Sequence, residues 1–159
     1  MTIHHLKEDR SLTVVTLSLG KQVLAIPAVR LREILDPMPV TRVPGAGPLV
    51  PAVLNVRGTV VPLANLKQVL RIPETEADDR RRILVLDVTI ASEAAVVAIE
   101  ADAVHEVATI ETAIIEPVPA AASAWPPEYL TGLYRGGEGF VLMPDLDQIL
   151  SVLAQRPMA

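Results

Sequence analysis

The side chains suited to acid–base or metal chemistry are few in this sequence. Its histidines are His4, His5 and His105, and it has no cysteine, which excludes disulfides, cysteine-ligated metals and thiol catalysis. His4 and His5 are adjacent near the amino terminus, and we interpret them as tail residues without a ligand role. His105 stands beside Glu106, outside any HExxH pattern that would hold zinc. We therefore predict no metal site and no cofactor.

Nucleophilic catalysis is not indicated either. A serine hydrolase needs a presented nucleophile with a base in reach, and none of the serines lies in a GxSxG pattern. The glycine-rich segment Val43–Pro48 (VPGAGP) lacks the Gly-Lys-Ser/Thr ending of a phosphate-binding loop, and Pro48 has no backbone N–H to offer a phosphate. We predict a loop at this segment and no catalytic residue in the chain.

Two adjacent segments resemble pieces of diguanylate cyclase domains. Leu130–Arg135 (LTGLYR) and Gly136–Phe140 (GGEGF) are similar to motifs that lie far apart in that family, and Gly139 stands where an acidic residue is expected. Adjacent segments cannot supply the two separated parts of one nucleotide site. We interpret the pair as a β-hairpin. An enzyme such as a nucleotide cyclase is kept as an alternative, which a nucleotide-binding measurement would test.

Length and composition restrict the class of protein further. Of the 159 residues, 50% are hydrophobic and only 3% are aromatic, so the core must be built from aliphatic side chains. The formal charge of −5 disfavours nucleic acid as a partner. Val43–Val56, the longest run without a charged side chain, is interrupted by prolines and too short to span a membrane, and no apolar signal segment begins the chain. We expect no membrane insertion and a cytoplasmic location.

Short segments rich in β-branched residues predict a mainly β fold with short helices. Strands are expected at Leu12–Leu19, Val23–Ile26, Val50–Val56, Thr59–Val61, Ile83–Ile90, Ala94–Ile99, Tyr129–Tyr134 and Gly139–Met143, with turns at Arg57-Gly58, Ser92-Glu93 and Gly136–Glu138. Asn65–Leu70 and Asp145–Leu153 are predicted to be helices, because Asn and Asp are good N-cap residues. The pattern of Ala28–Leu35 fits either a helical turn or a strand.

The sequence contains an internal repeat. Val23–Glu33 (VLAIPAVRLRE) aligns without a gap to Val96–Glu106 (VVAIEADAVHE), and Asn65–Leu70 (NLKQVL) aligns to Asp145–Leu150 (DLDQIL). The two matches keep the same order along the chain, which favours a duplicated β unit over chance. Two such units are each too small to bury much surface alone, so we expect them to pack together and to form a groove at their junction.

The segment Pro51–Leu66 (PAVLNVRGTVVPLANL) resembles the CheW family of bacterial chemotaxis coupling proteins. That family carries a hairpin of the form N-hydrophobic-R-G-x-hydrophobic-hydrophobic-P, followed by (D/N)-L. The residues that match it are Asn55, Arg57, Gly58, Pro62 and Leu66. Further similar segments follow in the family's order at Leu31–Ile34, Val40–Pro44, Val96–Val107 and Tyr129–Leu133. The resemblance therefore extends over nearly the whole chain, from Leu12 to Leu150.

The resemblance implies an all-β fold of two small five-stranded SH3-like barrels, in agreement with the repeat. We expect residues 1–159 to form a single CheW-like domain with lobes at about 23–80 and 81–150, the first completed by a swapped terminal strand or strands. CheW-like proteins bridge the cytoplasmic tips of chemoreceptors to the regulatory domain of the histidine kinase CheA, and neighbouring lobes meet in rings. The resemblance thus implies an adaptor without catalysis, located at chemoreceptor arrays.

Five partner-binding residues are implied by the same resemblance. Arg57 corresponds to an arginine tied to kinase and receptor coupling, Glu33 to a glutamate important for partner binding, and Gly58 shares the hairpin tip of Arg57. Leu31 matches an apolar receptor contact, and Val104 is its counterpart in the repeat. We hypothesise that the opposite charges of Arg57 and Glu33 lie close enough to orient each other. Leu31 and Val104 are expected to line a groove that receives the apolar stripe of a receptor helix.

Other interpretations stay open from the sequence. Leu31 and Val104 would also suit a plain core, Glu33 a solvated surface, and Gly58 a turn. The chain departs from the family at Ala52 and at the Asn65 and Ala103 positions, where Gly, Asp and Gly are usual. These departures leave open which kinase or receptor is matched. An adaptor of twitching motility or of another chemosensory pathway, and a scaffold that assembles into rings with other CheW-like chains, are the alternatives.

Overall fold

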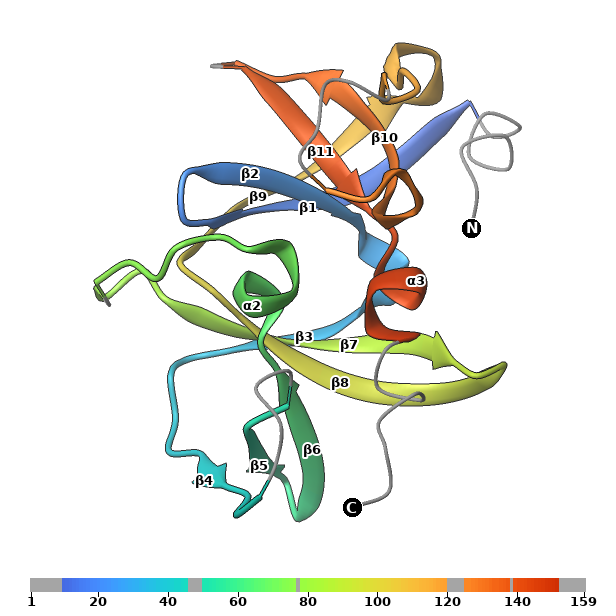
Figure 1. Cartoon of the computed structure of the whole chain (residues 1–159). Helices are drawn as coiled ribbons and strands as arrows, with labels where there is room; N and C mark the ends of the chain where they lie inside the picture. Colours follow the sequence, from blue (N-terminus) through green and yellow to red (C-terminus); the bar gives the residue numbers. More distant parts are fainter. Residues whose placement is uncertain (1–9, 46–49, 77, 120–124, 138, 152–159) are drawn as a thin grey trace.

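The computed structural model describes residues 10–45, 50–76, 78–119, 125–137 and 139–151. The fold is mainly β, as expected, and consists of two curled sheets with short helices between them (Figure 1). Sheet A has the order β10-β11-β2-β1-β9 and contains β1 (Ser11–Leu19), β2 (Gln22–Pro27), β9 (Ala103–Glu111), β10 (Leu130–Arg135) and β11 (Phe140–Pro144). Sheet B has the order β3-β7-β8-β6-β5-β4 and contains β3 (Leu31–Leu35), β4 (Thr41–Arg42), β5 (Ala52–Val56), β6 (Thr59–Ala64), β7 (Arg82–Ile90) and β8 (Glu93–Ala101).

The strand composition is consistent with two SH3-like units, with two differences from the expectation. Sheet A has the expected five strands, whereas sheet B gains the two-residue strand β4, which pairs with β5. Neither sheet closes into a complete barrel, because the strands at the ends of each order do not pair with each other among the described residues. The fold class is confirmed, in an open form.

Most of the predicted strands and turns are confirmed in position. The segment Ala28–Leu35, for which the sequence fits either a helical turn or a strand, contains one of each. It forms a 3-10 turn, η1 (Ala28–Arg30), followed by strand β3. The turn predicted at Ser92-Glu93 lies one residue earlier, because Ala91 and Ser92 have the positive φ angles and Glu93 already pairs with Ile90. Strand β9 was not predicted as a strand, since its many exposed positions give it no strong apolar alternation.

The helices follow their capping residues. Helix α2 (Leu66–Leu70) begins after Asn65, whose side chain accepts a hydrogen bond from the backbone N–H of Gln68. Helix α3 (Leu146–Leu150) begins after Asp145, which accepts the N–H of Gln148 in the same way. Each cap satisfies a backbone donor that the first helical turn leaves free. The predicted end of the second helix at Leu153 lies outside the described residues.

The chain crosses from one sheet to the other at each copy of the repeat. After β2 in sheet A, the turn η1 leads into β3 in sheet B, and after β8 in sheet B, Asp102 leads into β9 in sheet A. As a result, sheet B contains strands from both sides of residue 80, and so does sheet A. The lobes at residues 23–80 and 81–150 stay a prediction as domains.

The two sheets are built on the same plan. Reading sheet A as β10-β11-β2-β1-β9 matches sheet B strand by strand as β5-β6-β8-β7-β3. In both, one hairpin joins the next strand through a parallel pairing, Leu142 opposite Leu24 in sheet A and Leu63 opposite Ala98 in sheet B. The repeat seen in the sequence is therefore a repeat of strand order and of pairing type.

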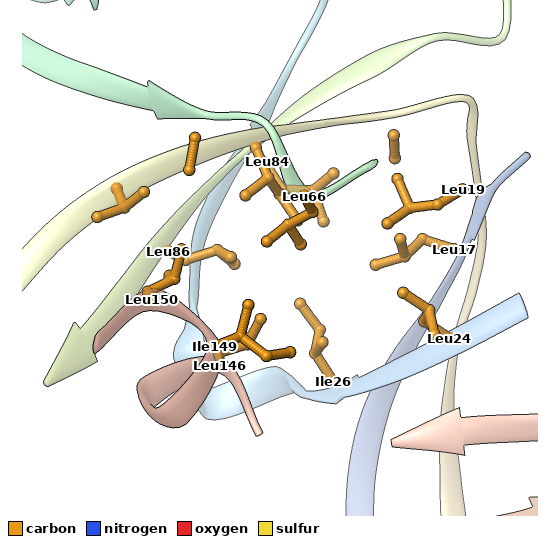
Figure 2. Packing of buried hydrophobic residues seen from close by; sticks show 14 of the residues in the cluster. Leu17, Leu19, Leu24, Ile26, Leu66, Leu84, Leu86, Leu146, Ile149 and Leu150 are labelled. Atoms are coloured by element: carbon orange, nitrogen blue, oxygen red, sulfur yellow. The ribbon is translucent and has the colours of Figure 1, made fainter. Parts of the chain in front are cut away.

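The counterparts of the repeat also share their burial. Within sheet A, Val14, Ala25, Tyr134 and Val141 form a buried cluster, and their counterparts within sheet B are Ile83, Ala98, Leu54 and Val61. A larger core lies between the sheets and is shared by both (Figure 2). Most of it is made of paired counterparts, Val15 with Leu84, Leu17 with Leu86, Leu19 with Val88, Leu24 with Val97, Ile26 with Ile99, Leu66 with Leu146, and Leu70 with Leu150.

This shared core explains why neither half would be expected to stand alone. Leu17, Leu24 and Ile26 from sheet A face Leu84 and Leu86 from sheet B, and all are almost completely buried. Separating the halves would return these side chains to water, at about 1.5–3 kcal/mol for each large aliphatic side chain. Among the described residues, no helix is long and apolar enough to cross a membrane.

Candidate functional site

The hairpin between β5 and β6 presents Arg57 at its tip. Arg57 and Gly58 form a two-residue turn in which both have positive φ, 51° and 84°, which is the geometry of a type I′ turn. The turn is held by a hydrogen bond of 2.8 Å from the Gly58 N–H to the Asn55 carbonyl oxygen Oδ1. Glycine adopts this backbone at no steric cost, but arginine does so less readily. The fold therefore accepts a mild strain to place an arginine here.

Arg57 contacts Glu33 across the curled sheet. Its Nη1 donates to Glu33 Oε2 at 2.6 Å, so the hypothesis that these two charges lie close together is confirmed. Glu33 lies on β3 and Arg57 lies at the β5–β6 tip, so the ion pair joins strands near opposite ends of sheet B. The side chain of Arg57 is 76% exposed and that of Glu33 is 23% exposed. The pair thus holds an accessible guanidinium in a defined orientation.

Leu31 and Val104 lie at equivalent places in the two halves. Leu31 is the first residue of β3 and Val104 the second of β9, each directly after the chain has crossed between sheets. Both are partly buried and pack against the shared core. Neither Leu31 nor Val104 lines the surface pockets beside Lys67, beside Tyr134 and beside Tyr129. The two side chains are placed between core and surface, and the groove expected between them stays a prediction.

His105 has a structural partner. Its Nε2 lies 2.6 Å from Ser18 Oγ on the neighbouring strand β1. The counterpart of this contact in the other half is the ion pair between Arg32 and Asp87, at 2.8 Å. His105 therefore occupies an ordinary cross-strand position. Among the described residues no group of three or more His, Cys, Asp or Glu side chains is arranged to hold a metal, and His4 and His5 lie outside them.

Two polar contacts that the sequence did not suggest connect the helices to the crossings. Lys67 on α2 donates to Asp102 at 2.9 Å, and Arg30 of η1 forms a two-pronged ion pair with Asp147 on α3, at 2.8 and 3.0 Å. Each carboxylate also accepts a backbone N–H from a β-hairpin, from Gly20 to Asp102 and from Thr89 to Asp147. One signal in the sequence could have indicated these contacts. In the aligned helix segments, Lys67 of the first copy stands where the second copy has Asp147, so a charged residue occupies the same place in both.

The environment of Asp102 favours its charged form. Burial by itself raises its pKa, but hydrogen bonds from the Gly20 N–H, from Lys67 and from the Thr75 hydroxyl outweigh this and hold the pKa of Asp102 below its ordinary value. Lys67 is only 10% exposed, so this is a largely buried ion pair. It fixes the start of β9, and with it Val104, relative to helix α2.

The comparison with known proteins now decides the family. A family model described as CheW-like domain matches residues 13–154. The chain belongs to the CheW family. The chemotaxis protein CheW of Klebsiella aerogenes is 29% identical over 134 residues, which cover 84% of this chain and 78% of that protein. The chemotaxis protein CheW of Treponema pallidum is 23% identical over 155 residues, covering 94% of this chain and 91% of that protein.

A solved CheW structure shares the fold. The scaffolding protein TtCheW from Thermoanaerobacter tengcongensis superposes with a TM-score of 0.79, at 20% identity and with 89% of each chain covered. Membership of the CheW family accounts for the order of the sequence segments that surround Arg57. It places this chain among chemotaxis adaptor and scaffold proteins.

Proposed function

We propose that this CheW-family chain is a non-catalytic adaptor that couples the cytoplasmic tips of chemoreceptors to the histidine kinase CheA. The observation that carries the proposal is the Arg57–Glu33 pair, at 2.6 Å, on an exposed hairpin tip. An exposed salt bridge adds little to folding stability, usually less than about 1 kcal/mol. A strained turn that presents an oriented guanidinium is therefore better explained by recognition of a partner than by stability.

The five candidate residues divide into two kinds of contact. Arg57 and Gly58 at the hairpin tip and Glu33, which contacts Arg57, form the charged site. This site would set the orientation and the choice of the partner, because charges at the rim of an interface control specificity and association rate. Leu31 and Val104 would supply the apolar contacts for a receptor helix, since both reach the surface from the shared core. The adaptor would act in the cytoplasm at chemoreceptor arrays, without nucleic acid or a membrane segment of its own.

Reversing the charge at the tip tests the proposal. We expect Arg57→Glu to abolish capture of CheA or of a receptor fragment in a pull-down, because it places a second carboxylate beside Glu33. Arg57→Asn is the matched variant, since asparagine tolerates the left-handed backbone of the turn and removes only the guanidinium. Loss of binding in both variants assigns the effect to the charge. Normal binding by Arg57→Glu would refute the assignment.

The control for a non-specific charge effect lies in the connector before β7, outside β3 and the hairpin tip. Arg80 pairs with Asp78 at 3.0 Å, and both side chains are exposed, at 71% and 46%. Arg80→Glu changes the net charge by the same amount as Arg57→Glu and also places a second carboxylate beside the first, and we expect it to leave binding of both partners intact. Analytical ultracentrifugation of the purified protein separates the adaptor from a ring scaffold, which would form large species without any kinase.

The apolar contact needs a separate measurement. Titration with a helical peptide from a receptor tip is expected to shift the NMR signals of Leu31, Val104 and their neighbours on β3 and β9. Signals of the distant strand β4 serve as an internal reference. Shifts confined to other surfaces would contradict the assignment of Leu31 and Val104 to receptor binding, while leaving the test of Arg57 unaffected.

A further inference from the structure

The edge of sheet A that corresponds to the Arg57–Glu33 contact is open. The repeat makes Glu106 on β9 the counterpart of Glu33, and Gly137 at the β10–β11 tip the counterpart of Arg57. The assignment of the tips follows from pairing, because Tyr134 opposite Val141 corresponds to Leu54 opposite Val61. A glycine therefore stands where the other half has the arginine.

A pocket of about 650 Å³ lies at this edge. It is lined by Thr16, Lys21, Gln22, Val23, His105, Glu106, Tyr134, Phe140, Val141 and the glycines of the hairpin tip. The Glu106 carboxylate forms no hydrogen bond or ion pair with any described residue, although Lys21 also lines the pocket. Glu106 is exposed, and it thus presents an unpaired carboxylate to a concave surface.

Tyr134 provides a second, independent indication. Its side chain is packed in the core of sheet A and the residue is only 6% exposed, yet it lines the pocket. Its hydroxyl forms no hydrogen bond with the described residues and is open to the pocket, because no fully buried side-chain oxygen in this part of the chain lacks a partner. Burial raises the pKa of Tyr134, and the negative charge of Glu106 raises it further. A carboxylate and a hydroxyl that have no partner among the described residues therefore both line this pocket.

We propose that this pocket receives the guanidinium of an arginine carried by a hairpin tip of a partner protein. The chain itself supplies the template, because the counterpart glutamate, Glu33, is occupied by an arginine from a hairpin tip. The carboxylate of Glu106 can accept the forked N–H groups of a guanidinium, and the Tyr134 hydroxyl can accept a further one. Phe140, which is 52% exposed, adds apolar surface next to the charge, and the guanidinium of Arg135 lies 5.4 Å from the centroid of its ring. This inference does not rest on the function proposed above.

The test uses the whole protein and a backbone-cyclised hairpin peptide with Arg-Gly at its turn. We expect the peptide to shift the NMR signals of Tyr134, His105 and Glu106 and to lower the pKa of Tyr134, since a bound cation offsets the charge of Glu106. The same peptide with citrulline or lysine in place of arginine is expected to bind at least about tenfold more weakly, because a charge-assisted forked pair is lost. Equal binding of the citrulline peptide, or shifts elsewhere, would overturn the proposal.

Variants of the protein sharpen the result. Glu106→Gln is expected to weaken binding of the arginine peptide about tenfold. Glu111→Gln, on the same exposed strand, is expected to leave this binding unchanged. Gly137→Arg places an arginine at the counterpart of Arg57, and a Cβ there meets no atom within 4 Å. We expect this variant to fill the pocket from within and to block the peptide. Unchanged binding by Gly137→Arg, or equally tight binding of free N-acetyl-arginine amide, would overturn a site for a protein-borne arginine.

Discussion

Sheets A and B repeat one arrangement of strands, but the ion pair that connects each to a helix has the opposite polarity. On α2 the helix supplies the cation, Lys67, and the crossing between sheets supplies the carboxylate, Asp102. On α3 the helix supplies the carboxylate, Asp147, and the crossing supplies the cation, Arg30. The positions of the two charges are exchanged, while the contact between helix and crossing is kept.

What stays the same in both halves is the carboxylate's second contact. Asp102 accepts the Gly20 N–H at 2.6 Å and Asp147 accepts the Thr89 N–H at 2.8 Å, and Gly20 and Thr89 are counterparts in the repeat. The contact from Gly20 is partly buried and the contact from Thr89 is exposed, so the same arrangement is kept in two different environments. In each half the carboxylate therefore joins a hairpin backbone to the contact between helix and crossing, whichever element carries it. The two hairpin tips also differ. In sheet B, Arg57 contacts Glu33, whereas in sheet A a pocket lies beside the counterpart glutamate, Glu106.

The largest effects are expected in the shared core, where the halves are most alike. Leu17 and Leu86 are counterparts and both are completely buried. Leu17→Ala and Leu86→Ala are each expected to lower the free energy of unfolding by about 2–5 kcal/mol. Urea denaturation followed by circular dichroism measures both. A small loss in one and a large loss in the other would show that the two halves do not contribute equally to the core.

Intermediate effects are expected at the helix contacts. Asp102→Asn and Asp147→Asn each remove the nearest carboxylate from a partly buried cation, Lys67 or Arg30, and each is expected to cost about 1–3 kcal/mol in the free energy of unfolding. Asp87→Asn is the control, because its pair with Arg32 is about half exposed and should contribute little. If Asp87→Asn destabilised the protein as much as the other two, the special role of the helix contacts would be contradicted.

The Asp102 contact also predicts a dependence on pH. Its pKa in the folded protein is below its ordinary value, so its contribution is fully present above the unfolded aspartate pKa, about 3.9, and is lost as the pH falls through the lower folded value. The difference in unfolding free energy between the native protein and Asp102→Asn should therefore shrink below about pH 4. Parallel denaturation series between pH 2 and 7 would measure this, and a constant difference would contradict it.

The smallest effects separate the two hairpin tips. Gly58 has a φ of 84°, so Gly58→Ala is expected to cost about 1–2 kcal/mol through its backbone alone. Gly137 lies outside the left-handed region and has open space at its Cβ position, so Gly137→Ala is expected to change stability by less than about 0.5 kcal/mol. Thermal unfolding of both variants tests this contrast. An equal loss would mean that the open tip is as restricted as the occupied one.

The local structure of this protein could largely be predicted from its sequence. Strand segments, the Arg57-Gly58 turn and the caps at Asn65 and Asp145 depend on residues a few positions apart, and the structure confirms them. The resemblance to the CheW family, together with the opposite charges of the two residues, also predicted the Arg57–Glu33 pair. Strand β9 was missed because one of its faces is exposed and its partner, β1, is distant in the chain.

The sequence by itself determined the elements and the doubled plan, because turns, caps and apolar spacing act over short distances along the chain. The tertiary structure decided which elements meet. Only the exchange of strands between sheets brings Asp102 to Lys67 and Arg30 to Asp147, and only the curl of each sheet brings one hairpin tip to Glu33 and leaves Glu106 open. Such contacts join residues far apart in sequence, and their geometry follows from how the two sheets twist and pack around their common core.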